Sequence, residues 1–168
     1  YDQIGGGFHR YATDAHWMIP HFEKMLYDNA LLVIAYLEAY QMTAREDFAR
    51  IAVEILEFVE RDLSTDEGAF YSALDAESGV DTTTSRGREG NYYTWTKNEI
   101  YKVLGKKDGE IFIEAFAVND GGNFFGRTVL GAPVDLMTLS QRKDLKFPDL
   151  KENVRGSMRK LFDARLKR

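Results

Sequence analysis

The sequence contains no cysteine, and this absence removes several classes of protein at once. Without cysteine the chain has no disulfide framework, no thiol nucleophile and no cysteine-held zinc or iron–sulfur site. Cysteine usage therefore gives no indication of the redox compartment. A run of eighteen or more apolar residues, which a membrane-spanning helix needs, is also missing. Since no targeting segment is recognisable either, we expect a cytoplasmic location without membrane contact.

Basic residues are also fewer than acidic residues. Lysine and arginine number 22 against 27 aspartate and glutamate residues, which gives a net charge of −5. Non-specific binding to nucleic acid requires a basic face, so we expect no nucleic-acid partner. The 168 residues, 44% of them hydrophobic, suffice for a buried core. Because the chain begins at Tyr1 without methionine and 164–168 reads as mid-helix, we expect a fragment of a longer protein.

Two long helices are predicted in the first half of the chain. Pro20 suits the first position of a helix, and Glu23 would then lie in the first turn. Residues 43–46, Thr-Ala-Arg-Glu, have the pattern of a capping box and predict the start of a second helix. A short connection between two amphipathic helices predicts an antiparallel helical hairpin.

Short strands are expected on both sides of these helices. Residues 8–19 predict a small hairpin that turns near Thr13 and Asp14. Residues 68–74 predict a strand, 78–90 a polar loop, and 91–95 the strand that returns. The sequence therefore predicts a small β-hairpin inserted among helices.

The second half again predicts helices. Residues 96–99, Thr-Lys-Asn-Glu, form a capping box, and Gly105 is the expected stop of the helix that follows. Further helices are predicted over 108–118 and from Pro148 onward, with 124–134 irregular. The fold class is thus mainly α. Helix pairs recurring every 70–80 residues are typical of helical arrays, including alpha-alpha toroids.

A dense group of polar and aromatic residues lies in 5–28, where all three histidines occur. Titratable residues on a glycine-rich loop before a helix are typical of a functional site. The alternative is a tight turn with hydrogen-bonded core histidines. The spacings of His9, His16 and His21 differ from the i, i+4 pair of zinc proteases, so we expect no metal, and we expect no cofactor.

A second group lies in 75–95. Asp75 and Glu89 would end two paired strands, and paired carboxylates 5–10 Å apart perform glycoside hydrolysis. Tyr92 and Trp95 could stack on sugar rings. The alternative is a solvated acidic loop beside core aromatics.

Several segments together resemble one family. The first is 5–30, beginning Gly-Gly-Gly-Phe-His-Arg-Tyr and containing Pro-His-Phe-Glu-Lys-Met-Leu-Tyr-Asp-Asn-Ala; later blocks at 70–76, 89–96 and 122–124 follow in the same order. They resemble the thioredoxin-domain-containing protein family that includes spermatogenesis-associated protein 20. The resemblance implies a partial (α/α)6 toroid, similar to six-hairpin glycosidases. Residues 1–168 would form its N-terminal part, and the thioredoxin-like domain and the remaining hairpins would be missing partners.

The resemblance also marks individual residues. The expected catalytic residues are His21, Glu23, His9, Asp75 and Glu89. The expected substrate-binding residues are Arg10, Asp14, Trp17, Tyr27, Asp28, Tyr92 and Trp95. His16 falls where the family pattern is free, so we expect no role for it. In a toroid, the 5–28 segment and the 70–96 hairpin would face each other across a cleft.

Two functions remain open from the sequence. In the first, the chain is part of a sugar-active enzyme, with His21 or His9 as the proton-transfer group of an epimerase. In a hydrolytic version, Glu23, Asp75 and Glu89 supply the acid and the base. In the second, the chain is a non-catalytic ligand-binding or scaffold module that serves the thioredoxin-like domain. Exposed apolar surface on a partial toroid would also allow homo-oligomers.

Overall fold

The computed structural model describes residues 1–78 and 88–168. They form two units, Tyr1–Gly90 and Asn91–Arg168, each with its own core. The polar loop expected at 78–90 lies, apart from its ends, outside the described residues. The described part is mainly helical with short strands, which confirms the fold class at that level. Within it, no helix is long and apolar enough to cross a membrane.

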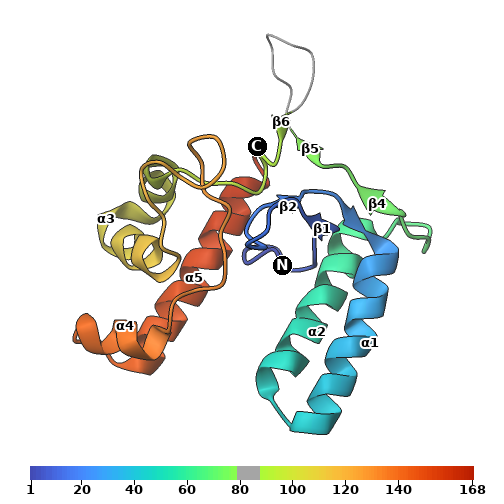
Figure 1. The fold of residues 1–168 in the computed structure, drawn as a ribbon, viewed down its shortest axis with the longest axis horizontal. Helices are drawn as coiled ribbons and strands as arrows, with labels where there is room; N and C mark the ends of the chain where they lie inside the picture. Colours follow the sequence, from blue (N-terminus) through green and yellow to red (C-terminus); the bar gives the residue numbers. More distant parts are fainter. Residues whose placement is uncertain (79–87) are drawn as a thin grey trace. The chain divides into compact units, whose positions relative to one another are not determined.

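A pair of antiparallel helices forms the main body of the first unit. Helix α1 is Leu26–Thr43, helix α2 is Glu46–Phe58, and a π-helical turn, η1, continues α2 over Val59–Leu63. The two helices lie side by side along their length (Figure 1). The predicted helical hairpin is therefore confirmed.

The start of α1 corrects the sequence prediction. Pro20 does not open the helix, because Pro20–His21 form strand β2 and Lys24–Met25 form strand β3. The backbone of this segment is paired with neighbouring strands, so the helix begins only at Leu26. The local proline signal was overridden by strand pairing.

The join between α1 and α2 is also made differently than predicted. Thr43 belongs to α1, where its hydroxyl donates to the carbonyl of Ala39 at 2.6 Å. Ala44 ends α1 in the left-handed conformation, and Arg45 precedes α2 without a side-chain cap. The acidic first turn of α2, with Glu46 and Asp47, favours the helix N-terminus electrostatically instead.

Three two-stranded antiparallel sheets accompany the helices. Strand β1 (Tyr11–Ala12) pairs with β2, so the hairpin expected near Thr13 and Asp14 is confirmed. Strand β3 pairs with β4 (Ala73–Leu74). Strand β5 (Glu77–Ser78) pairs with β6 (Arg88–Glu89). The predicted return strand at 91–95 was wrong, because the return is made by β6, and only Trp95 forms a bridge, to Thr128.

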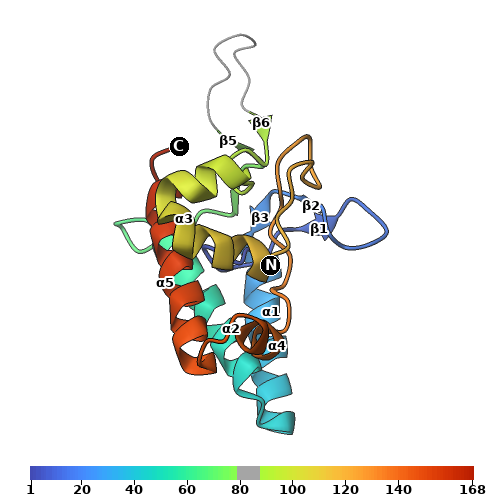
Figure 2. The same ribbon diagram turned by 90° about the vertical axis from the view of Figure 1, so that its left-hand side faces the viewer.

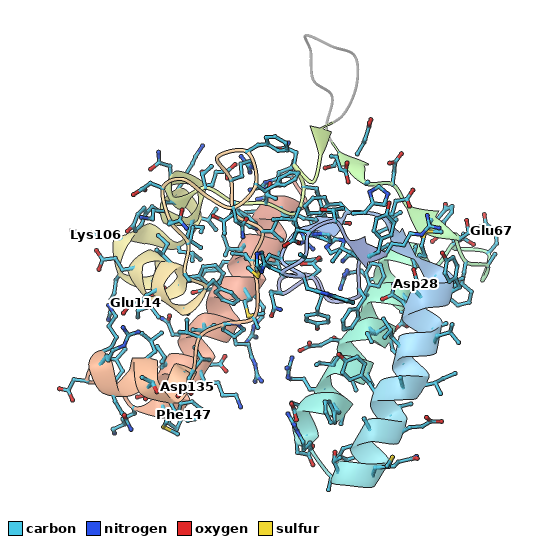
Figure 3. All side chains as sticks on the ribbon, viewed as in Figure 1. Asp28, Glu67, Lys106, Glu114, Asp135 and Phe147 are labelled. Carbon is cyan, nitrogen blue, oxygen red and sulfur yellow. The ribbon has the colours of Figure 1, made fainter. Side chains whose placement is uncertain are left out.

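The second unit is built from three helices in the described residues. Helix α3 (Lys97–Ala115) begins at the capping box of Thr96 and Glu99, as predicted. Gly105, with φ of 75°, divides α3 into two segments that meet at an angle (Figure 2). Helix α5 (Phe147–Arg165) was expected, whereas α4 (Leu136–Arg142) was not. Glu114, marked in Figure 3, forms ion pairs with Arg142 and Lys143 and so ties α3 to the end of α4.

Each unit buries its own set of large apolar side chains. In the first unit Phe22, Ile55, Phe58 and Leu63 are fully buried. In the second unit Ile100, Phe112, Leu139, Leu150 and Leu161 are fully buried. Phe22 and Phe58 lie directly beside the loop and strands that carry the polar cluster described below, so the core of the first unit supports that cluster.

Gly7 is a position where only glycine fits. Its φ is +73°, and a Cβ atom there would lie 2.4 Å from Cδ1 of the buried Phe58 ring. Left-handed strain together with overpacking predicts that Gly7→Ala lowers the free energy of unfolding by about 2–4 kcal/mol. Gly68 is the matched control, because its φ is +83° and nothing lies within 4 Å. Denaturant unfolding of both variants should show the larger loss for Gly7→Ala; equal losses would contradict the role of the Phe58 contact.

Candidate functional site

One histidine and two glutamates converge at the surface of the first unit. Nδ1 of His21 lies 2.8 Å from Oε1 of Glu89, and Nε2 of His21 lies 3.2 Å from Oε2 of Glu23. The side chains of His21, Glu23 and Glu89 are 24%, 31% and 44% exposed. The imidazole is thus bracketed by two carboxylates that remain open to solvent. We call His21, Glu23 and Glu89 the histidine cluster.

Strand geometry brings these residues together. His21 ends β2 and Glu23 precedes β3, and side chains two residues apart on an extended chain project to the same face. Glu89 comes from β6, 68 residues along the chain from His21. The amide of Phe22 lies 3.4 Å from Oε1 of Glu89, so the same carboxylate oxygen contacts the His21 ring and the backbone next to it.

Arg10 forms an ion pair with Glu23 of the cluster. Its guanidinium lies 3.1 Å from Oε2 of Glu23, and its amide donates to the carbonyl of Glu23 at 2.9 Å. Glu23 therefore contacts two cationic or protonatable groups, Arg10 and His21. The two ring nitrogens of His21 thus each face a carboxylate oxygen, Nδ1 that of Glu89 and Nε2 that of Glu23.

Other charged groups do not extend this cluster into a metal site. Within residues 1–78 and 88–168, no three histidine, aspartate or glutamate side chains are placed to coordinate a metal ion.

His9 contacts Phe22, the residue between His21 and Glu23. Its Nδ1 is 3.1 Å from the carbonyl of Phe22, and its ring meets the Phe22 ring edge-on at 5.4 Å. Burial, followed by the nearby charge of Lys24, lowers the pKa of His9 to about 3. A neutral imidazole with so low a pKa is a poor proton carrier near pH 7.

The low pKa of His9 predicts a dependence of stability on pH. The unfolded chain has an ordinary histidine pKa near 6.5, so it binds the proton first as the pH falls. The contribution of His9 to stability is complete above about pH 6.5 and is lost as the pH falls toward 3. We expect the loss of unfolding free energy between pH 7 and pH 4.5 to be smaller in His9→Asn by on the order of 2 kcal/mol.

The control for this experiment is His16→Asn, because His16 is exposed and offers the same substitution. Urea unfolding at the two pH values measures the difference for each protein. Equal pH dependence in wild type and His9→Asn would contradict the burial of a neutral His9.

Asp14 and Trp17 belong to the loop between β1 and β2. The carboxylate of Asp14 accepts hydrogen bonds from the amides of His16, Met18 and Ile19. These bonds, led by that of Ile19, lower the pKa of Asp14. The loop fixed in this way presents Trp17 with φ of 58° and 85% of its surface exposed. Asp14 thus shapes the loop, and Trp17 offers an open aromatic face.

Tyr27, Asp28 and Asp75 lie in the same unit. Tyr27 is 49% exposed on the first turn of α1. Asp28, marked in Figure 3, has a buried Oδ2 atom without a hydrogen-bond partner in the described part of the chain. Asp75 is exposed, and its Oδ1 accepts from the amide of Glu77 at 3.0 Å. No contact joins Asp75 to the histidine cluster among the described residues.

Tyr92 and Trp95, the two aromatic residues expected to bind substrate in the second unit, pack against α5 and the end of the chain. The Arg165 guanidinium lies 4.7 Å from the centroid of the Tyr92 ring. Trp95 is 1% exposed, and the Arg168 guanidinium lies 3.9 Å from its ring centroid. The structure therefore places Trp95 in the core of its unit, against the Arg168 guanidinium.

Sequence reasoning overlooked two polar residues, Lys24 and Asn29, that bind the N-terminal glycine-rich segment to β3 and α1. Lys24 is 1% exposed, and its Nζ lies 2.8 Å from Oδ2 of Asp2 and 2.7 Å from the carbonyl of Gly6. Asn29 bonds to both the amide and the carbonyl of Phe8. The available signal was a single lysine and a single asparagine within a largely apolar stretch, 22–37.

Comparison with known proteins finds relatives of the chain but no matching family model. Over 98% of its length the chain is homologous to a segment of larger animal proteins, of which it covers 23%. Those proteins are spermatogenesis-associated protein 20 of Homo sapiens, 36% identical over 183 residues, and of Mus musculus, 35% identical. An uncharacterized protein of Caenorhabditis elegans is 37% identical over 131 residues, which cover 73% of the chain and 18% of that protein.

Proposed function

We propose that the histidine cluster is the proton-transfer site of a carbohydrate-active domain that acts as a sugar epimerase. The observation that carries the proposal is the position of His21 between Glu23 and Glu89, at 3.2 Å and 2.8 Å, in a partly exposed setting. Imidazole takes up and releases protons near neutral pH, as proton transfer to and from a substrate requires. Epimerisation next to a carbonyl needs a group that removes and returns a proton at carbon.

The same geometry disfavours glycoside hydrolysis by this cluster. A hydrolase needs room for a sugar or a water molecule between its two carboxyl groups. Glu23 and Glu89 instead direct their carboxylates at the ring of His21, which fills that space. Asp75 is bonded to a turn amide and has no contact with the cluster in the described residues. Within this cluster, imidazole is therefore the group best placed to move a proton.

The longer contact, from Nε2 of His21 to Glu23, is the one that a substrate would replace. Arg10, whose guanidinium lies 3.1 Å from Glu23, would remain a partner of that carboxylate when a substrate takes its place at Nε2. Nδ1 stays bonded to Glu89, which fixes the tautomer and the ring. Exposed aromatic side chains in the same unit, Tyr11, Trp17 and Tyr27, provide apolar faces suited to sugar rings.

We further propose that residues 1–168 form the N-terminal part of an (α/α)6 toroid next to a thioredoxin-like domain. The α1–α2 hairpin and the homology to a protein about four times as long support this assignment. The upstream domain and the remaining hairpins would then be the partners of this chain. Non-catalytic sugar binding is the second candidate, favoured by the Arg10–Glu23 and Asp14 contacts, which tie loop and strands together.

The experiment that tests the proposal measures proton exchange at sugar carbon. The 168-residue chain, and in parallel the full-length human relative, are incubated in D2O with aldoses, N-acetylated amino sugars and reducing disaccharides. Loss of the C2 proton signal by NMR is the expected result. Sugar binding by saturation transfer without exchange would favour the binding module, and neither exchange nor binding would reject the carbohydrate proposal.

A further inference from the structure

A neighbouring aromatic ring lies against the histidine cluster. Tyr11 stands directly opposite His21 in the pairing of β1 with β2. The rings of Tyr11 and His21 are stacked, with centroids 5.1 Å apart and planes inclined by 25°. Tyr11 is 53% exposed, so this stack lies at the surface and is not a core contact. The Arg10 guanidinium lies 5.9 Å from the centroid of the Tyr11 ring.

The cluster requires a defined orientation of the imidazole. Its two nitrogens contact carboxylates from two separate parts of the chain, Glu23 beside β3 and Glu89 on β6. Rotation of the ring about its bond to Cβ would lengthen both contacts at once. Strand pairing fixes the backbone of His21 but leaves this rotation open. A flat partner against the ring face removes that freedom.

We propose that Tyr11 is a positioning residue that fixes the ring plane of His21, so that Nδ1 and Nε2 each face a carboxylate. The aromatic ring performs this function, and the hydroxyl group is not required for it. The consequence for proton transfer rests on the proposed function, whereas the orientation of His21 does not.

Two substitutions separate the ring from its hydroxyl. Tyr11→Phe keeps the stack, whereas Tyr11→Ile removes the ring and keeps the β-propensity that the short strand needs. Imidazole N–H protons that are hydrogen-bonded exchange slowly enough for NMR detection at low temperature. We expect a hydrogen-bonded imidazole N–H signal of His21 in wild type and in Tyr11→Phe, and its weakening by at least tenfold or its loss in Tyr11→Ile. Assignment comes from the disappearance of this signal in His21→Asn.

The amide of Thr13, which donates to the carbonyl of Ile19 at 2.7 Å, reports whether the β1–β2 hairpin is intact. Phe70→Ile is the matched control, since Phe70 is an aromatic residue of the same unit with 57% exposure. Unchanged His21 signals in Tyr11→Ile would overturn the inference. Joint loss of the Thr13 and His21 signals would also overturn it, because Tyr11 would then act on the hairpin. Altered His21 signals in a protein that exchanges no sugar proton would keep the inference and reject the proposed function.

Discussion

Replacing Lys24 by methionine should lower the free energy of unfolding of the first unit by about 3–5 kcal/mol, because it leaves a buried charge without its partner. Lys24 is 1% exposed and Asp2 is 5% exposed, and their charged atoms lie 2.8 Å apart. Nζ also donates to the carbonyl of Gly6 and lies 4.4 Å from the centroid of the Phe58 ring. The substitution would therefore remove the contacts that join β3 to the glycine-rich loop.

The control for Lys24 is an ion pair at the surface. Arg45 and Asp47 are 61% and 45% exposed and lie 2.6 Å apart. Arg45→Ala should change the unfolding free energy by less than about 1 kcal/mol, since exposed pairs contribute little. Urea titration followed by circular dichroism measures both variants at pH 7. A cost below 1 kcal/mol for Lys24→Met would contradict the burial of the pair.

A double variant tests whether the penalty comes from the isolated charge. Asp2→Asn retains the Oδ1 oxygen that accepts from the amides of Ile4 and Gly5 but removes the charge. Combined with Lys24→Met, it removes both charges of the buried pair. We expect the double variant to be more stable than Lys24→Met alone, because replacing both members of a buried pair costs less than breaking it.

Helices whose signals are local could be predicted from the sequence. The capping box of Thr96 and Glu99, the break at Gly105 and the start of α5 near Pro148 each depend on a few neighbouring residues. The α1–α2 hairpin follows from apolar spacing in the same way. By contrast, α4 has seven residues and no long apolar periodicity, so its only signal was the Asp135 cap.

Strand positions could not be fixed in this way. Each strand has two residues, and its partner can lie far away in sequence, as Lys24 and Leu74 do. No alternation of apolar and polar residues can appear in so short a strand. The helix signal of Pro20 was therefore given too much weight, since the pairing of β2 with β1 arises from contacts that the local sequence does not show.

The candidate site also contains residues that the sequence pointed to correctly and residues that it did not. Resemblance to a family marked His21, Glu23, Glu89 and Arg10, and the structure brings these four side chains into contact. It also marked Asp75, which bonds to the amide of Glu77, and Trp95, which is buried in the core of the second unit. The burial of Lys24 was not predicted, because lysine side chains are usually exposed and because its partner Asp2 lies 22 residues away in sequence.

His21→Asn should reduce sugar proton exchange by about 100-fold or more, the contribution of a general acid–base group. Asparagine retains a polar side chain that can contact Glu23 or Glu89, so the strands stay paired while the proton carrier is lost. Glu89→Gln should cost less, because a glutamine oxygen can still accept from Nδ1 of His21.

His16→Asn supplies the matched control for the activity measurement. His16 is exposed, lies five residues from His21, and has a backbone amide bonded to Asp14. Because the same chemical change is made on both histidines, a general effect on folding or on surface charge would appear in both proteins. Exchange that falls in His21→Asn and persists in His16→Asn assigns the proton transfer to the cluster. Equal exchange in wild type and His21→Asn would instead exclude His21, and the cluster would then be a set of contacts that joins β2, β3 and β6.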